Sequence, residues 1–162
     1  MGSRSKIEKI DLAYIAGFLD GDGSLMLQLK KRKDGKTGLR FMATICFYQD
    51  SHHDAPLRWI RECFGIGYLS KRNDGMSELR INGFKQVREI SKNLLPYIRF
   101  KKIQAKALHE ACEILSTGTL RTLDKKSLRQ LVSLILVMQN KNYTTKKKKT
   151  KRELLEILGL TP

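Results

Sequence analysis

The segment Ile7–Gly23 constrains the fold most narrowly, because a helical pattern there leads straight into a strand pattern. Large apolar residues recur every four positions, as on one side of an α-helix: Ile10, Tyr14 and Phe18. Small residues repeat at the same spacing on an adjacent stripe: Ala13, Gly17 and Gly21. Glycine inside a helix costs about 1 kcal/mol relative to alanine. The smooth stripe therefore indicates that another backbone packs closely against this helix.

From Ser24 the period changes to two, which is typical of a half-buried strand. Leucines occupy one face of Ser24–Arg32, and mostly polar residues occupy the other: Met26, Gln28, Lys30 and Arg32. The residues Asp34-Gly35-Lys36 form a turn signal, and alternation resumes from Leu39 to Tyr48. We expect a hairpin with one apolar face and one polar, partly basic face.

The remaining patterns complete an α+β fold with an αββαββα core. A short helix is expected at Pro56–Phe64, a second hairpin at Gly65–Arg72 and Met76–Asn82, and further helices at Phe84–Leu94, Lys101–Leu115, Leu123–Gln139 and near Glu153–Leu158. Helices are expected to cover the apolar face of a four-stranded antiparallel sheet and to leave the other face open. We predict a single domain over residues 1–162, with its core at about 7–139 and a basic C-terminal segment at about 140–162.

The charge balance favours a polyanionic partner. Lys and Arg number 32 against 16 Asp and Glu, for a net charge of +16. Removing the six charges of Lys146, Lys147, Lys148, Lys149, Lys151 and Arg152 still leaves +10 on the rest of the chain. The excess therefore belongs to the folded body as well, which favours nucleic acid. Composition alone also allows an ordinary basic surface, as on a ribosomal protein.

Other site classes find little support in the sequence. The three cysteines, Cys46, Cys63 and Cys112, are odd in number and widely spaced, which argues against a zinc site or a disulfide framework. No stretch has the length of a membrane span, and the apolar N-terminal run lacks the features of a secretory signal. We expect an intracellular protein with no membrane partner.

Ile15-Ala16-Gly17-Phe18-Leu19-Asp20-Gly21-Asp22-Gly23 resembles the nine-residue LAGLIDADG signature. As in that family, the segment ends a helix that leads into a basic hairpin, and the resemblance extends over roughly residues 10 to 115. It looks closest to the single-motif, dimeric members from group I introns of organelles. The resemblance implies a homing endonuclease that makes metal-dependent double-strand breaks in a long, near-palindromic DNA target. It also implies a homodimer through the stripe of Ala13, Gly17 and Gly21.

Asp22 is the expected catalytic and metal-binding carboxylate. The last turn of a helix offers unpaired carbonyls and the negative end of the helix dipole, which favour a cation. A carboxylate there suits Mg²⁺ (or Mn²⁺), which keeps most of its waters and takes one or two protein ligands. Asp20 is expected to have a structural role or to support Asp22 without binding the metal itself.

Further roles follow from the resemblance alone. Gly21 matches the residue whose carbonyl assists metal binding, and Gln49 matches a residue that positions solvent. Lys101 matches the active-site lysine, although a register shifted by one would select Lys102. His53 stands where familiar relatives carry arginine, which is a departure from the pattern.

The expected DNA contacts share the outward parity of the strands, because side chains of this kind read base edges in the major groove. They are Gln28, Lys30, Arg32, Arg40, Met42, Tyr48, Ser70, Arg72, Glu78 and Arg80, with Cys46 on the same parity. We expect Lys146, Lys147 and Lys148 to contact phosphates. A plainly solvated strand face and linker are the alternatives.

Two other functions stay open on the sequence. One is an RNA maturase or a non-cleaving DNA- or RNA-binding protein on the same scaffold, and intron RNA is the less favoured partner. The other is a basic ribosomal or structural RNA-binding protein. The expected compartment is an organelle (chloroplast or mitochondrion) or a microbial cytoplasm.

Overall fold

A computed structural model describes residues 6–34, 38–143 and 146–162 of the chain. Gly35 and Lys36 of the expected turn, and Thr144 and Thr145 of the C-terminal linker, lie outside the described residues. Among the residues described, no helix combines the length and apolar composition needed to cross a lipid bilayer.

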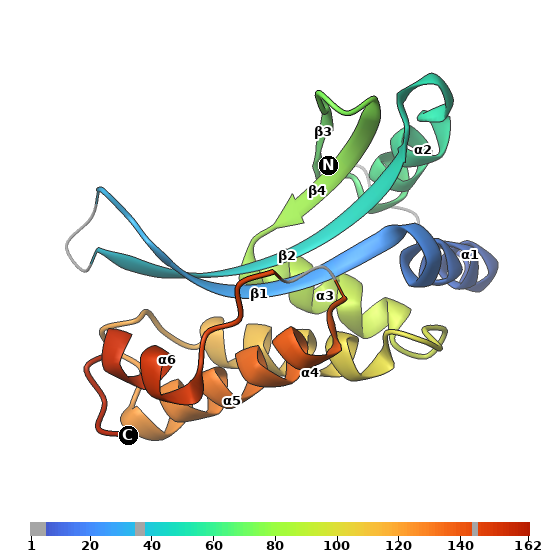
Figure 1. Ribbon diagram of the computed structural model, residues 1–162. Helices are drawn as coiled ribbons and strands as arrows, with labels where there is room; N and C mark the ends of the chain where they lie inside the picture. The colour runs from blue at the N-terminus through green and yellow to red at the C-terminus, as the bar shows by residue number, and fades with distance from the viewer. Residues whose placement is uncertain (1–5, 35–37, 144–145) are drawn as a thin grey trace.

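The secondary structure follows the expected order of helix, hairpin, helix, hairpin and helices (Figure 1). The elements are α1 (Lys9–Asp22), β1 (Gly23–Lys31), β2 (Leu39–Asp50), the 3₁₀ turn η1 (Ser51–His53), α2 (Ala55–Phe64), β3 (Tyr68–Lys71), β4 (Met76–Asn82), α3 (Phe84–Leu94), α4 (Lys102–Leu115), α5 (Lys125–Lys141) and α6 (Lys151–Ile157).

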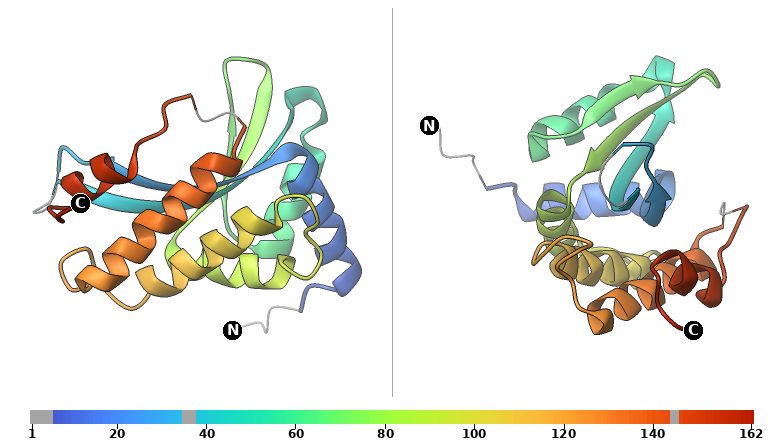
Figure 2. Two further views of the ribbon diagram at one scale, coloured as in Figure 1. Left: turned by 60° about the horizontal axis from the view of Figure 1, so that its bottom comes forward. Right: turned by 90° about the vertical axis from the view of Figure 1, so that its left-hand side faces the viewer.

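The four strands form one antiparallel sheet in the order β1-β2-β4-β3. Helices α3, α4 and α5 lie against one face of the sheet, and no described helix crosses the opposite face (Figures 1 and 2). The α+β class, the four-stranded antiparallel sheet and its open face are thus confirmed.

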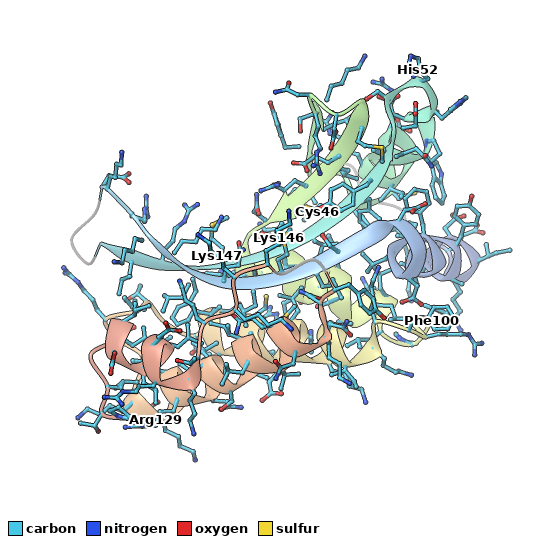
Figure 3. The ribbon with its side chains drawn as sticks, viewed as in Figure 1. Cys46, His52, Phe100, Arg129, Lys146 and Lys147 are labelled. Carbon is cyan, nitrogen blue, oxygen red and sulfur yellow. The ribbon has the colours of Figure 1, made fainter. Side chains whose placement is uncertain are left out.

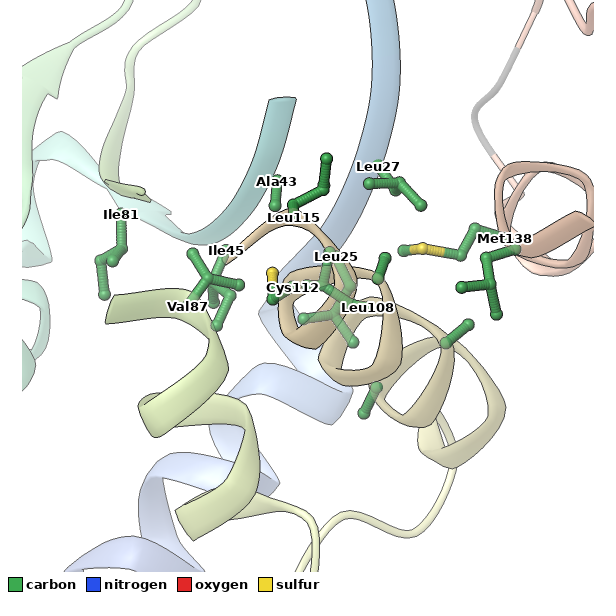
Figure 4. Close-up of a cluster of buried hydrophobic side chains, with 14 of the residues drawn as sticks. Leu25, Leu27, Ala43, Ile45, Ile81, Val87, Leu108, Cys112, Leu115 and Met138 are labelled. Carbon is green, nitrogen blue, oxygen red and sulfur yellow. The ribbon is translucent and has the colours of Figure 1, made fainter. Parts of the chain in front are cut away.

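The strand register aligns apolar residues across the sheet on its helix-covered face. Leu25 of β1 lies opposite Ile45 of β2, which in turn lies opposite Ile81 of β4. All three are at most 1% exposed. They face Val87 of α3 and Leu108 of α4 in the core (Figure 4). Because burial of apolar area is the main favourable term in folding, this layer holds the helices on one side only.

Strand β3 is shorter than predicted. The expectation of a strand from Gly65 is wrong, because Gly65 ends α2 in the left-handed conformation with φ 59°. Gly67 also has a positive φ, of 120°, and the strand begins only at Tyr68. Glycines tolerate these angles without steric cost, so the chain reverses direction between α2 and β3 in a short loop.

The C-terminal segment follows the free edge of β1. The Asn142 side chain donates to the carbonyl of Leu25 at 3.1 Å, and the Lys149 ammonium donates to the carbonyl of Leu29 at 3.3 Å. The Gln139 side chain bonds the backbone N–H and carbonyl of Lys149 at 3.1 Å and 3.0 Å. These contacts satisfy edge-strand carbonyls that are otherwise open to pairing with another chain.

Replacing Ile45 by alanine tests the central position of the sheet in the core. We expect the Ile45→Ala variant to lose about 2–5 kcal/mol of unfolding free energy, because a fully buried side chain leaves a cavity. Urea unfolding followed by circular dichroism measures the change. Arg40→Ala, on the exposed face of the same strand, is the matched control and should change stability by no more than about 0.5 kcal/mol. Equal losses in the two variants would contradict this assignment of the faces.

Candidate functional site

The open face of the sheet carries the polar and basic side chains expected from the strand alternation. Gln28, Lys30 and Arg40 are exposed, and Lys30 lies directly opposite Arg40 in the register. The exposed Arg32 follows the end of β1. A twisted antiparallel ribbon with such side chains matches the width of a DNA major groove.

Glu78 and Asp74 pair with the two arginines at the other end of this face. The Glu78 carboxylate bonds the Arg80 guanidinium at 3.1 Å from Nε and 3.0 Å from Nη2. The Arg72 guanidinium lies 3.9 Å from the same carboxylate, pairs with Asp74 at 2.9 Å and stacks 5.7 Å from the centre of the Tyr48 ring. Glu78, with 12% of its side chain exposed, therefore fixes the direction of Arg80, and Asp74 is the close partner of Arg72. Ordered guanidinium groups are suited to bidentate contacts with base edges.

Cys46 shares the parity of the open face, but the expectation that it is available for contact is wrong. Its side chain is fully buried, at 0% exposure. Its larger neighbours on this face are Tyr48, two residues along the same strand, and Arg80, directly opposite in the register. Burial raises the pKa of the Cys46 thiol. Met42, Tyr48 and Ser70 are half-buried, so they keep part of their surface available.

A groove at the end of α1 brings several of the predicted centre residues together. It lies along β1 and the start of the open face, and its lining includes Asp20, Gly21, Asp22, Lys101, Lys146 and Lys147. Asp22 and Gly21 are exposed, and Lys101 is half-buried. Lys146 and Lys147 lie beside β1, whereas Arg129 lies on the opposite, helical side of the molecule (Figure 3). The groove therefore combines an exposed carboxylate with several cationic side chains.

Lys101 is fixed against the C-terminal end of α1. Its ammonium donates to the carbonyl of Leu19 at 2.8 Å and to that of Gly23 at 2.6 Å. Burial lowers the pKa of Lys101, and the nearby carboxylates of Asp20 and Asp22 oppose this effect. Lys102, the alternative in a shifted register, is exposed at the start of α4. The geometry therefore favours Lys101 as the lysine of the groove.

Asp20 connects the same two segments through backbone hydrogen bonds. Its carboxylate accepts from the N–H groups of Arg99 at 2.7 Å, Phe100 at 3.3 Å and Lys101 at 2.9 Å. These partners are 79 to 81 residues away in the sequence. Asp20 and Asp22 therefore have different surroundings, one bonded within the protein and the other open to solvent.

Gln49 and His53 are not among the residues that line this groove. The side-chain oxygen of Gln49 accepts from the N–H of Asp50 at 2.9 Å, which turns it back toward its own strand. His53 is exposed in η1, next to His52, whose ring pairs with Asp50 at 3.0 Å. Gln49 lies on β2 two residues beyond Phe47, which pairs with Gly23, so its backbone is near the end of α1 while its side-chain oxygen is bonded locally.

The donors at the end of α1 suit a hard divalent cation. The described residues contain no cluster of three or more His, Cys, Asp or Glu side chains that would hold a metal by themselves. A single exposed carboxylate beside helix-end carbonyls matches Mg²⁺, which usually keeps several waters and takes substrate phosphates as ligands. Gly21 and Asp22 therefore fit an ion that binds together with a nucleic acid.

One side of α1 is open to solvent in the single chain. A Cβ placed on Gly17 or Gly21 would meet no atom within 4 Å. Ile10 and Tyr14, on the same side, are 72% and 62% exposed, whereas the residues of the opposite side are buried: Ile15, Ala16 and Leu19. Apolar side chains flanking a smooth helical stripe are typical of a surface that a second helix covers.

Sequence reasoning missed two exposed aromatic residues near the site. Tyr68, at 69% exposure, lies opposite Arg80 on the open face, and strand parity with Ser70 was the available signal. Phe100, at 85% exposure, lies beyond the end of α1 (Figure 3). No periodic signal marks Phe100, because it belongs to the irregular segment between α3 and α4.

Comparisons with known proteins agree with this geometry. The family model described as LAGLIDADG endonuclease matches residues 15–115. The DNA endonuclease I-CvuI of Chlorella vulgaris is 32% identical over 99 residues, which cover 61% of this chain and 62% of that relative. The DNA endonuclease I-CreI of Chlamydomonas reinhardtii is 28% identical over 114 residues, covering 70% of this chain and 69% of that relative.

Solved structures give the same result. Two crystal structures of I-CvuI with DNA, one in 2 mM Mg with the DNA not cleaved and one in 2 mM Ca, match with a TM-score of 0.73 and 28% identity. Each match covers 95% of this chain and 98% of the I-CvuI chain. The archaeal intron-encoded homing endonuclease I-Vdi141I, complexed with DNA, matches with a TM-score of 0.78 over 94% of this chain and 97% of that chain. At 21% identity, this last match shows the fold alone.

Thiol alkylation tests the coverage of Cys46 on the open face. Cys46 and Cys112 are buried, whereas Cys63 is half-buried. Burial raises the pKa of Cys112 to about 12. With that pKa, about one Cys112 thiol in ten thousand is ionised at pH 8. We expect native protein treated with iodoacetamide at pH 8 to be labelled at Cys63 first, with Cys46 and Cys112 labelled only after unfolding. Peptide mass spectrometry identifies the sites, and rapid native labelling of Cys46 would contradict its burial.

Proposed function

Because the chain belongs to the LAGLIDADG endonuclease family, we propose that it is a homing endonuclease that hydrolyses phosphodiester bonds in both strands of a long, near-palindromic DNA site. The observation that carries this proposal is the exposed Asp22 carboxylate, placed where α1 passes directly into the open, basic face of the sheet. A duplex lying across that face would bring its backbone to the end of α1.

The residues of the open face supply recognition in this proposal. Arg80, held by Glu78, and Arg72, paired with Asp74, would read base edges together with three further residues of this face: Gln28, Lys30 and Arg40. The exposed Lys146, Lys147 and Lys148 would contact phosphates, which adds affinity without sequence information. The crystal structures of I-CvuI in complex with DNA support DNA as the partner.

Asp22 and Gly21 would hold a divalent cation, with Mg²⁺ or Mn²⁺ as the expected ions. When bound, the ion lowers the pKa of an attacking water and stabilises the leaving 3′ oxygen. The Lys101 ammonium, fixed at the end of α1, would stabilise negative charge on the attacked phosphate. Solvent positioning by Gln49 and His53 stays a prediction, and for Gln49 it requires the side chain to turn from its present contact with the N–H of Asp50.

Cutting both strands requires two centres, and this chain carries one motif. We propose that two chains pair through the exposed stripe of Ala13, Gly17 and Gly21, with Ile10 and Tyr14 at its margin. Two Asp22 carboxylates would then lie near the two-fold axis, one for each DNA strand. An isologous pairing of this kind also accounts for a near-palindromic target.

The chain would act as one domain over residues 1–162, because the C-terminal segment packs on β1 through Asn142 and Lys149. An organelle or a microbial cytoplasm stays the expected compartment.

Cleavage selection from a randomised duplex library with Mg²⁺ tests the function directly. We expect double-strand cuts at one near-palindromic site. Asp22→Asn should slow cleavage by at least about 100-fold, because it removes the charge that holds the cation. EDTA should abolish cleavage by the parent protein. The parent protein and Asp22→Asn should bind the selected site equally well in Ca²⁺. Asp11→Asn, at the other end of α1, is the matched control and should cleave normally.

Sequence-specific binding without cleavage in any divalent cation would overturn the nuclease proposal and favour a non-cleaving binding protein. Preferential binding of structured RNA over duplex DNA would favour the maturase.

A larger residue on the glycine stripe tests the proposed dimer. We expect Gly17→Leu to fold but to remain a monomer, because its side chain has space in the single chain and would collide with a closely packed partner helix. Sedimentation velocity measures the mass, and circular dichroism checks the helix content. Ser133→Leu, at an exposed position of α5, is the control and should leave the dimer intact. A Gly17→Leu dimer of normal affinity would show that the interface lies elsewhere.

A further inference from the structure

The structure assigns to Asp20 a specific task in the proposed reaction: we propose that Asp20 is the positioning residue that holds Lys101 in the cleavage centre. This inference rests on the proposed endonuclease function and extends it to a residue whose carboxylate is bonded within the protein. The residue acts through the backbone of the segment that carries Lys101.

The unusual position of Asp20 is the first observation. It lies in the last turn of α1, where the negative end of the helix dipole disfavours a carboxylate. A solvated acid there would only destabilise the helix. The Asp20 carboxylate instead accepts three backbone hydrogen bonds from Arg99, Phe100 and Lys101. Hydrogen bonds to a charged acceptor are stronger than neutral ones, and these three offset the unfavourable dipole.

The direction of the Lys101 side chain is the second observation. While the Asp20 carboxylate holds the Lys101 N–H at 2.9 Å, the ammonium of the same residue reaches back to the carbonyls of Leu19 and Gly23. Lys101 is therefore tied to the end of α1 at both its backbone and its side-chain terminus. A lysine side chain has many rotamers, so anchoring only its ammonium would leave its position poorly defined.

The third observation is that Asp20 fixes the backbone of a segment that is distant in the sequence and that is otherwise tied to the end of α1 by the Lys101 ammonium. Arg99–Lys101 lies in the irregular segment between α3 and α4. Without a fixed backbone this segment would move relative to α1, and Lys101 would move with it. A displacement of about 1 Å at a catalytic group is enough to slow a reaction by ~100-fold. The Asp20 contact therefore acts on the rate of the chemical step, with little expected effect on DNA affinity.

A double-mutant cycle tests the proposal. We expect Asp20→Asn to slow single-turnover cleavage by about 10- to 100-fold at saturating Mg²⁺, with DNA binding in Ca²⁺ changed less than about threefold. In the Lys101→Ala background, Asp20→Asn should cause less than about a twofold further loss, because its effect passes through Lys101. An equally large loss in both backgrounds would overturn the proposal and leave Asp20 with a general structural role.

Two further variants separate position from charge and from folding. Asp20→Glu keeps the negative charge at the end of α1 but moves the carboxylate by one methylene, so we expect it to slow cleavage as well. Full activity of Asp20→Glu would show that only the charge matters and would overturn the positioning role. Asp11→Asn removes the same charge from the other end of α1 and should leave the rate unchanged.

Amide hydrogen exchange of the complete, metal-free protein gives a readout that does not depend on cleavage. The amides of Arg99, Phe100 and Lys101 should exchange at least about tenfold faster in Asp20→Asn, because they lose their acceptor. Unchanged exchange would overturn the proposal. If the parent protein cleaved no duplex, the proposed function would fail, while the exchange measurement would still decide whether Asp20 holds this segment.

Discussion

The direct passage from α1 into β1 at Gly23 is the constraint on which the functional site depends. A side chain at Gly23 would place its Cβ 2.8 Å from the carbonyl oxygen of Leu19 and 2.9 Å from its Cα. These are backbone atoms that cannot give way, so the junction requires a residue without a side chain. With no loop between the two elements, Leu19 points into the core while Asp22 stands at the margin of the open face. Any shift of α1 would move both.

This junction also explains why two acids occur at the wrong end of a helix dipole. Each acid at that end interacts unfavourably with the helix dipole, and a different partner offsets this interaction for each of the two acids. Asp20 is compensated inside the protein by three backbone N–H groups, and the Lys101 ammonium takes up two of the helix-end carbonyls. Asp22 is compensated by solvent in the single chain and by a divalent cation in the proposed function. Of the two acids at this end of the helix, Asp20 therefore makes a structural contact and Asp22 keeps an exposed carboxylate.

Much of this arrangement was predictable from local sequence patterns, and the remainder depends on contacts distant in the sequence. Alternation fixes which faces Leu25 and Gln28 occupy, because neighbouring residues of a strand point in opposite directions. The nine-residue motif places Asp22 at the end of α1. No local pattern, however, predicts that Asp20 binds residues 79 to 81 positions away, or that Lys149 reaches the edge of β1. The strand alternation also gave a wrong expectation at Cys46. Alternation gives the direction of a side chain, but it does not tell whether larger neighbouring side chains cover that residue.

The distribution of charge separates affinity from discrimination in the proposed complex. Exposed lysines such as Lys146 and Lys147 carry their charge on a long side chain without a planar fork, so they would attract any duplex through its phosphates. Arg80 is oriented by Glu78 and Arg72 by Asp74, and each pairing gives up part of the positive potential in return for a defined geometry. A negatively charged side chain on a DNA-facing sheet would only weaken DNA binding if the sole role of the face were to attract phosphates. The hydrogen bonds of Glu78 to Arg80 are consistent with a surface that selects among base pairs, because a misdirected guanidinium cannot make a bidentate contact.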